Sequence, residues 1–265
     1  MQMVAASKMR RAQEAVTASR PYAEKLREVL GGLVAGQAGA DPDATHPLLQ
    51  QRPVSRVLLL EISPDRGLAG GMPGNINRAA GEFIRRQQHP TAVVTVGKKG
   101  RDFMVRAGVD LRASFIDMGD RPSMADTLAA TRLVEQAYLS GEADEVHVAY
   151  TRYVNTLVQT PTLARLLPIS TEGLEEGPAV DYLYEPNAAV VLGALLPRFL
   201  EVQVYQAFLE NCASEQSARM VAMRNATEAA EDMIESLTLE LNKARQNMIT
   251  AELLDLVVGA AALEG

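Results

Sequence analysis

The turn over residues 65–71 is the stretch whose residue types and spacing come nearest to a chemical site. It reads Asp-Arg-Gly-Leu-Ala-Gly-Gly and follows an apolar run that predicts a buried strand. In doubly wound folds a Gly-rich turn at this place holds phosphate on the amides of the next helix. Here the spacing is not GxGxxG, the P-loop lysine is absent, and Met72-Pro73-Gly74 interrupts the expected helix start. We therefore favour a tight, close-packed turn with positive φ over a nucleotide site.

Other polar residues lack the spacing of a catalytic or metal site. His46, His89 and His147 are scattered, and no His/Cys/Asp/Glu grouping has metal-ligand spacing. The acidic pairs Asp144-Glu145 and Glu175-Glu176 favour solvated faces over acid–base catalysis. We expect no catalytic residue, no metal ion and no cofactor.

Composition restricts the class of partner. A net charge of −7 argues against general binding of nucleic acid or of anionic membranes. Cys212 is the single cysteine, so it forms no disulfide within the chain, and the first residues lack the pattern of a secretory signal. No run of about 18 uninterrupted apolar residues predicts a membrane span. We expect a cytoplasmic protein.

The elements that would position the turn form an α/β domain over residues 54–181. Strands are predicted at 54–62, 91–96, 111–116, 145–150 and 163–169, and helices at 75–88, 101–107 and 122–139. This alternation predicts a largely parallel sheet with helices on both faces. The late strand with Pro161 and Pro168 should lie at an edge, where a missing donor is tolerated.

Long terminal helices flank this domain. Residues 1–30 predict a helix that ends at Gly31-Gly32, with Pro21 at a kink or join. Residues 31–53 read as a linker, 182–197 as a connection and 198–265 as a C-terminal helix, in which residues 198–258 contain no Gly or Pro. Its apolar positions advance by sevens, as in a coiled coil: Met220, Thr227, Ile234, Leu241, Met248, and Met223, Ala230, Leu237, Ala244, Ala251, Val258.

The C-terminal helix is apolar almost all round near its end, from residue 249 to 263. Residues 1–30, paired antiparallel with it, would bury one side of about half its length. The rest would leave apolar side chains in water, each at a cost of roughly 1.5–3 kcal/mol. The sequence therefore predicts an obligate subunit of a larger complex.

Six strings in the sequence are similar to the gamma subunit of F-type ATP synthases, a likeness that extends over essentially the whole chain. They are MVAASKMRRAQ at 3–13, SPDRGLAGG at 63–71, YVNTLVQTPTLARLLPI at 153–169, YLYEP at 182–186, ASEQSARMVAMRNAT at 213–227 and LTLELNKARQNMIT at 237–250. The resemblance implies a central rotor shaft without bond chemistry of its own. An antiparallel coiled coil would turn inside a ring of alternating alpha and beta subunits, above a Rossmann-like domain near the membrane.

The resemblance also implies contacts with the beta subunit. Arg245 and Gln246 match residues that bond to a loop of beta, and Arg219 and Met1 match positions near its acidic lever segment. For Arg219 and Arg245 the alternative is a solvated flank of the coiled coil. The chain also starts where the family's N-terminal helix is already under way, so we expect that helix to extend upstream of Met1.

The foot of the shaft is implied at residues 182–186. Tyr182, Tyr184 and Glu185 match positions that meet the polar loops of the c ring, with local packing as the alternative for the two tyrosines. The epsilon subunit is a further implied partner. The regulatory insertion of plant members is absent, so we expect a bacterial complex, peripheral to the membrane on its cytoplasmic face.

Two other classes stay open from the residues alone. One is a nucleotide-dependent α/β enzyme that uses residues 65–71, with its helices as a dimerisation arm. The other is a coiled-coil scaffold without rotary function.

Overall fold

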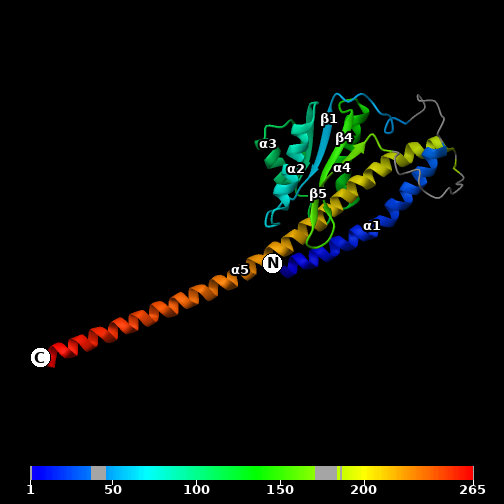
Figure 1. The fold of residues 1–265 in the computed structure, drawn as a ribbon. Coiled ribbons are helices and arrows are strands. Elements are labelled where there is room, and N and C mark those ends of the chain that lie inside the picture. The colour runs from blue at the N-terminus through cyan, green and yellow to red at the C-terminus, as the bar shows by residue number, and fades with distance from the viewer. Residues whose placement is uncertain (1, 37–45, 171–183, 186, 265) are drawn as a thin grey trace. The chain divides into compact units, whose positions relative to one another are not determined.

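The computed structural model describes residues 2–36, 46–170, 184, 185 and 187–264. The chain divides into two compact units, Met1–Val221 and Ala222–Gly265. The first unit contains the sheet and all the helices except the later part of the last one, and the second unit is that later part (Figure 1).

The first unit is organised around a five-stranded sheet in the order β3-β2-β1-β4-β5. The strands are β1 (Val57–Ile62), β2 (Thr91–Val96), β3 (Leu111–Phe115), β4 (Glu145–Tyr153) and β5 (Gln159–Leu167). All neighbours are parallel except β4 and β5, which pair antiparallel. The predicted parallel sheet is confirmed. Pro161 does lie on the edge strand β5, and Pro168 follows that strand.

Helices cover both faces of the sheet (Figure 1). They are α1 (Gln2–Gly36), α2 (Met72–Arg86), α3 (Lys98–Arg106), α4 (Met124–Leu139) and α5 (Ala188–Glu264). Alternate residues of β1 face the two layers, as the period of two in a strand requires. Leu59 packs with Ile76 of α2 and Met104 of α3. Leu58 and Leu60 belong to a larger core with residues of α4, α1 and α5.

In the first unit α1 packs antiparallel to the beginning of α5 (Figure 1). Val16 contacts Leu209 and Ala213, whereas the guanidinium of Arg198 lies 3.4 Å from the Tyr22 hydroxyl. Later residues of α1 therefore meet earlier residues of α5. This confirms the antiparallel pairing expected for the terminal helices.

Two predicted helix boundaries are wrong, and tertiary packing explains both. α1 continues through Gly31-Gly32 to Gly36, because Leu30 and Leu33 on either side are buried. The first residues of the predicted linker are therefore helix, and its residues 37–45 lie outside the described residues. α5 begins at Ala188, so residues 188–197 are helix rather than connection, and Pro197 lies inside the helix.

A third prediction, that Met72-Pro73-Gly74 interrupts a helix start, is also wrong. α2 begins at Met72, with Gly71 as its N-cap and proline in its first turn. Proline there sacrifices no hydrogen bond, because the first amides of a helix have no partner within it. The Gly-rich turn thus leads directly into α2.

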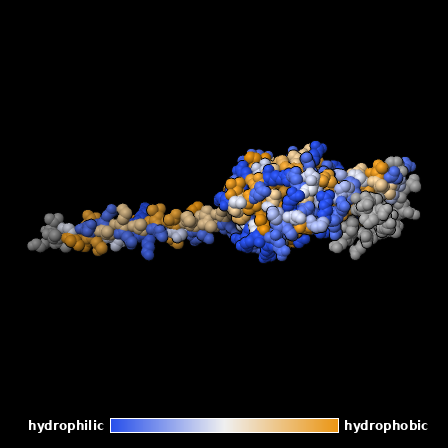
Figure 2. Space-filling model, turned by 90° about the horizontal axis from the view of Figure 1, so that it is seen from above, coloured by the Kyte–Doolittle hydropathy of each residue, from blue (hydrophilic) through white to orange (hydrophobic). Residues whose placement is uncertain are grey.

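The second unit, Ala222–Gly265, is the later part of α5. Its described side chains are exposed or nearly so, including many large apolar ones: Met233, Ile234, Leu237, Leu239, Leu241, Met248, Ile249, Leu253, Leu254, Leu256, Val257 and Val258. Figure 2 shows hydrophobic atoms along the surface of this segment. Among the described residues α5 is the one helix long and apolar enough, by composition, to cross a membrane. One third of its most apolar window is buried in the fold.

Candidate functional site

The turn over residues 65–71 has the backbone of a tight connection. Leu68 and Gly70 have φ values of 63° and 57°, so the predicted positive φ is confirmed. The predicted close packing is wrong at Gly67 and Gly70, where an added Cβ would meet nothing within 4 Å. Asp65 fixes the start of the turn, because its Oδ1 accepts a hydrogen bond from the amide of Lys98 at 3.0 Å.

Helix α5 docks onto this turn. Ala218 packs against Ala69 and Met72. The Arg219 guanidinium forms an ion pair with Glu215 at 2.5 Å and donates to the Gly67 carbonyl at 3.3 Å. Both charged side chains are only 13–14% exposed. We call the turn together with residues 211–219 of α5 the junction. In it, Ala218 and Arg219 cover the turn from a helix of the same chain.

Charged side chains in and beside the junction are paired, and burial and pairing shift the pKa values of their carboxyl groups. Burial raises the pKa of Glu215 above its ordinary value, and the neighbouring Arg219 opposes that rise. The Lys8 ammonium pairs with Asp120 at 2.5 Å and holds the pKa of Asp120 below its usual range. Gln216 also donates to Asp120 at 3.4 Å. Residues of α1, of the loop before α4 and of α5 are thereby tied together.

A second set of bonds joins the junction to β4 and the loop that follows it. The Ser214 and Ser217 hydroxyls donate to the carbonyls of Thr151 and Thr156, at 3.0 and 2.9 Å. Asn211 accepts from the amide of Thr151 at 3.4 Å. Sequence reasoning missed these residues. Their spacing of three along the helix was the available signal, since it places all three on one face.

Predicted beta-contact residues fall in different places. Arg219 lies in the junction, where it is engaged by Glu215 and Gly67 rather than solvated. Arg245 and Gln246 lie in the second unit, with exposed side chains. Met1 lies outside the described residues, and its predicted role stays a prediction.

The predicted foot is described only in part, because Tyr182 lies outside the described residues. Tyr184 is half-buried against the main core, and a Cβ at Gly32 would lie 3.4 Å from its hydroxyl. Glu185 is exposed. The structure thus places Tyr184 in local packing, the alternative raised for it from the sequence, and leaves its surface role untested.

Among the described residues one acidic side chain is fully buried, and it lies within the apolar run of β1. Glu61 of β1 is fully buried and neither carboxyl oxygen has a hydrogen-bond partner. A Cβ at Gly100 would lie 2.7 Å from its Oε2, so only glycine leaves room for the carboxyl. Burial raises the pKa of Glu61 to about 8. In the parts of the chain that are described, no three His, Cys, Asp or Glu side chains are grouped to hold a metal ion.

Comparison with known proteins gives a consistent result. A family profile described as ATP synthase matches residues 1–263. The ATP synthase gamma chain of Dehalococcoides mccartyi strain CBDB1 is 52% identical over 264 residues, covering 99% of this chain and 92% of that protein. The ATP synthase gamma chain of Roseiflexus castenholzii is 51% identical over 267 residues, covering 99% and 91%.

Solved structures share the fold. The central stalk with c-ring of Tetrahymena thermophila mitochondrial ATP synthase has a TM-score of 0.64 at 24% identity, with 86% of this chain and 97% of that chain covered. A chain of the Euglena gracilis mitochondrial ATP synthase in rotational state 3 has a TM-score of 0.60 at 19% identity, covering 97% and 95%.

Proposed function

The chain belongs to the ATP synthase gamma-chain family, and from this we propose that it is the central-stalk rotor of a bacterial F-type ATP synthase. It passes torque between the ion-driven c ring and the catalytic sites on the beta subunits, and so couples proton or sodium flow to ATP synthesis or hydrolysis. The chain carries no bond chemistry itself. Its partners are the alpha, beta and epsilon subunits and the c ring, peripheral to the cytoplasmic face of the plasma membrane.

The observation that carries this proposal, beside the family, is the bare apolar surface of the second unit. Leu237, Leu241 and Met248 are examples of large side chains that are exposed there. Burying each one is worth about 1.5–3 kcal/mol, so a sleeve of other subunits is strongly favoured. Alpha and beta subunits arranged around the helix would supply that sleeve.

Torque transmission also needs a stiff shaft that is fixed to its base. α5 runs unbroken from Ala188 to Glu264, and residues 198–258 contain no Gly or Pro to soften it. The junction supplies the fixing, because Arg219, Ser214 and Ser217 bond this helix to the α/β fold before the second unit begins. A turning force on the sheet would thus reach the helix through buried contacts.

An asymmetric shaft would act on the beta subunits by differential contact. Whichever beta subunit meets a given side of the helix has its open or closed state favoured, and rotation moves that bias to the next subunit. Polar residues such as Arg245 and Gln246 are suited to such contacts, because their side chains are exposed and can form hydrogen bonds.

Co-purification with alpha and beta subunits tests the proposal directly. We expect one asymmetric complex with a single copy of this chain. A stable isolated monomer without affinity for those subunits would refute it. Equilibrium dialysis of the isolated chain with ATP and with NAD should detect no binding, whereas a nucleotide-dependent enzyme would bind one of them.

The rotor role and the scaffold role differ in their response to Arg245→Ala with Gln246→Ala. In the assembled complex we expect slower ATPase turnover, because contacts that change during rotation are lost. Glu235→Ala is the matched control, since it removes an exposed polar group about three turns earlier on the same helix. Equal rates for the double variant and the control would favour a scaffold.

A further inference from the structure

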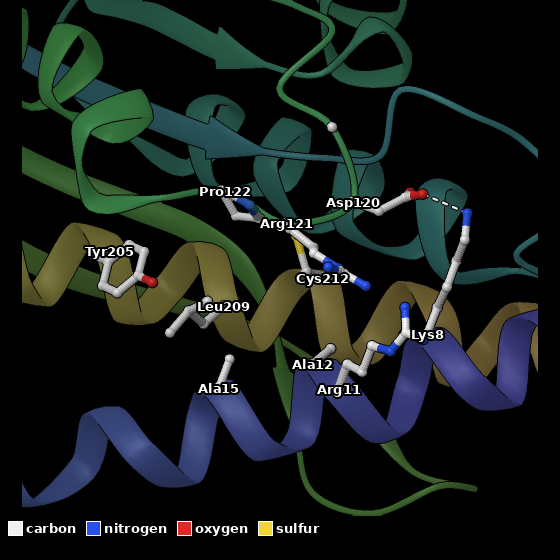
Figure 3. A pocket seen from close by; sticks show the side chains of 11 residues that line it. Lys8, Arg11, Ala12, Ala15, Asp120, Arg121, Pro122, Tyr205, Leu209 and Cys212 are labelled. Atoms are coloured by element: carbon white, nitrogen blue, oxygen red, sulfur yellow. Dashed lines mark hydrogen bonds and ion pairs between the residues drawn. The ribbon is translucent and has the colours of Figure 1, made fainter.

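A cavity of about 740 Å³ lies in the first unit between α1, α5 and the loop that precedes α4 (Figure 3). Its volume falls within the range of small-molecule sites, roughly 300–1,000 Å³. The function proposed above does not use it. The chemistry of its lining therefore decides what it could hold.

The lining is divided into a charged end and an apolar end. In Figure 3 the side chains of Lys8, Arg11 and Arg121 gather on the side of Asp120. Ala15 and other apolar groups, of which Leu209 is one, lie toward the opposite side, beside the ring of Tyr205. A ligand that fills the cavity must itself have one anionic and one apolar end.

The charged end of the cavity has more cationic than anionic side chains. Lys8 is paired with Asp120, whereas neither Arg11 nor Arg121 forms an ion pair with any described residue. Two guanidinium groups thus line the cavity without being paired to a carboxylate, in a chain whose net charge is −7. Guanidinium binds carboxylate through paired, charge-assisted hydrogen bonds.

Cys212 and Tyr205, which also line the cavity, are uncharged. Burial raises the pKa of the Cys212 thiol, with the neighbouring Glu215 acting in the same direction, so the sulfur is not a thiolate. Burial likewise raises the pKa of the Tyr205 phenol. Neither group repels an anion, and both present an uncharged surface to an apolar body.

We propose that this cavity binds a small amphipathic carboxylate, with the carboxylate at Arg11 and Arg121 and an aromatic or aliphatic body against Ala15, Leu209 and Tyr205. The division of the lining, the two unpaired guanidinium groups and the volume support it together. Such a ligand would bridge α1, α5 and the loop before α4, and would hold them together more tightly.

The test is isothermal titration of the assembled complex with 2-naphthoate, with its neutral isostere 2-naphthamide, and with decanoate. We expect saturable binding of a carboxylate and none of the amide. Naphthoate binding without decanoate binding would assign an aromatic body, and the reverse an aliphatic one. Equal binding of naphthoate and naphthamide, or no binding of either carboxylate, would overturn the proposal.

Variants of the chain locate the site. Arg11→Gln with Arg121→Gln should weaken carboxylate binding about tenfold or more, since charge-assisted bonds are lost. Ala15→Leu should block the apolar end without changing any charge. Arg10→Gln is the matched control, because Arg10 pairs with Glu14 and does not line the cavity. Unchanged binding in the double variant, or in Ala15→Leu, would refute the assignment.

Discussion

The same helix behaves differently in the two units of this protein. In the first unit its apolar residues are buried: Leu200 is 0% exposed and Val204 0%. In the second unit Leu241 is 69% exposed and Leu256 70%. Both stretches of the helix are rich in apolar residues, so the difference lies mainly in what surrounds it. A helix alone does not bury its own apolar stripe, and no other described residue of this chain covers that of the second unit.

The sharpest way to test this contrast is to remove one leucine from each unit. In the isolated chain Leu200→Ala should lower the free energy of unfolding by about 2–5 kcal/mol, because it leaves a cavity in the core. Leu241→Ala should change it by less than about 0.5 kcal/mol, since its side chain is already in water. Chemical denaturation of both variants measures the difference. Equal losses would mean that Leu241 is already buried by another part of the chain.

Glu61 should make the free energy of unfolding of the first unit depend on pH. Its folded pKa of about 8 stands above the ordinary 4.5, so the folded state binds the proton more tightly than the unfolded state. The resulting stabilisation is complete below pH 4.5 and is lost as pH rises to 8, by at most about 1.4 kcal/mol per unit. Glu61→Gln should abolish this slope and be more stable than the wild type near pH 8.

Denaturation at a series of pH values measures that slope. Glu82→Gln, which changes a partly exposed acid of α2, is the control and should keep the slope of the wild type. A slope that persists in Glu61→Gln would assign the effect to another group. Since the second unit holds no buried acid among its described residues, no comparable effect is expected from it.

The smallest predicted effect compares two Arg–Glu pairs with the same spacing of four. Glu215–Arg219 lies in the junction, with both side chains 13–14% exposed, and Arg224–Glu228 lies in the second unit, with 57–68% exposed. Double-mutant cycles to alanine should give a coupling of about 1–3 kcal/mol for the first pair. The second should give about 0.3–0.5 kcal/mol, because water screens it. Similar couplings would contradict the burial of Arg219.

Whether a segment forms a helix or a strand was predictable, because the pattern of apolar residues is clear where both faces of the segment are buried. β2 was predicted at 91–96 and occurs at Thr91–Val96, a β-branched run between turn residues. The missed boundaries of α1 and α5 are at Gly31-Gly32 and Pro197, residues that stop helices by propensity alone. Glycine costs a helix about 1 kcal/mol and proline about 3, less than the burial of several neighbouring leucines returns.

The site was less predictable than the fold. The positive φ of Gly70 followed from the glycines of the turn, whereas that of Leu68 did not, and nothing local shows that Arg219 lies against Gly67, 152 residues away. The isolated acid Glu61 and the cavity beside Cys212 likewise depend on which elements meet. Such contacts form between segments distant in the chain, and local sequence does not encode them.

The sequence by itself determined the α/β class, the long terminal helices, the family and the need for partner subunits. Each of these depends on periodicity, composition or strings of residues, which are properties of neighbouring positions. The tertiary structure alone decided that α1 and α5 continue past their helix breakers, that Asn211, Ser214 and Ser217 bind β4 and the loop after it, and that Arg11 and Arg121 flank one cavity. Those outcomes depend on burial and on charge matching between distant segments, which exist only once the chain has folded.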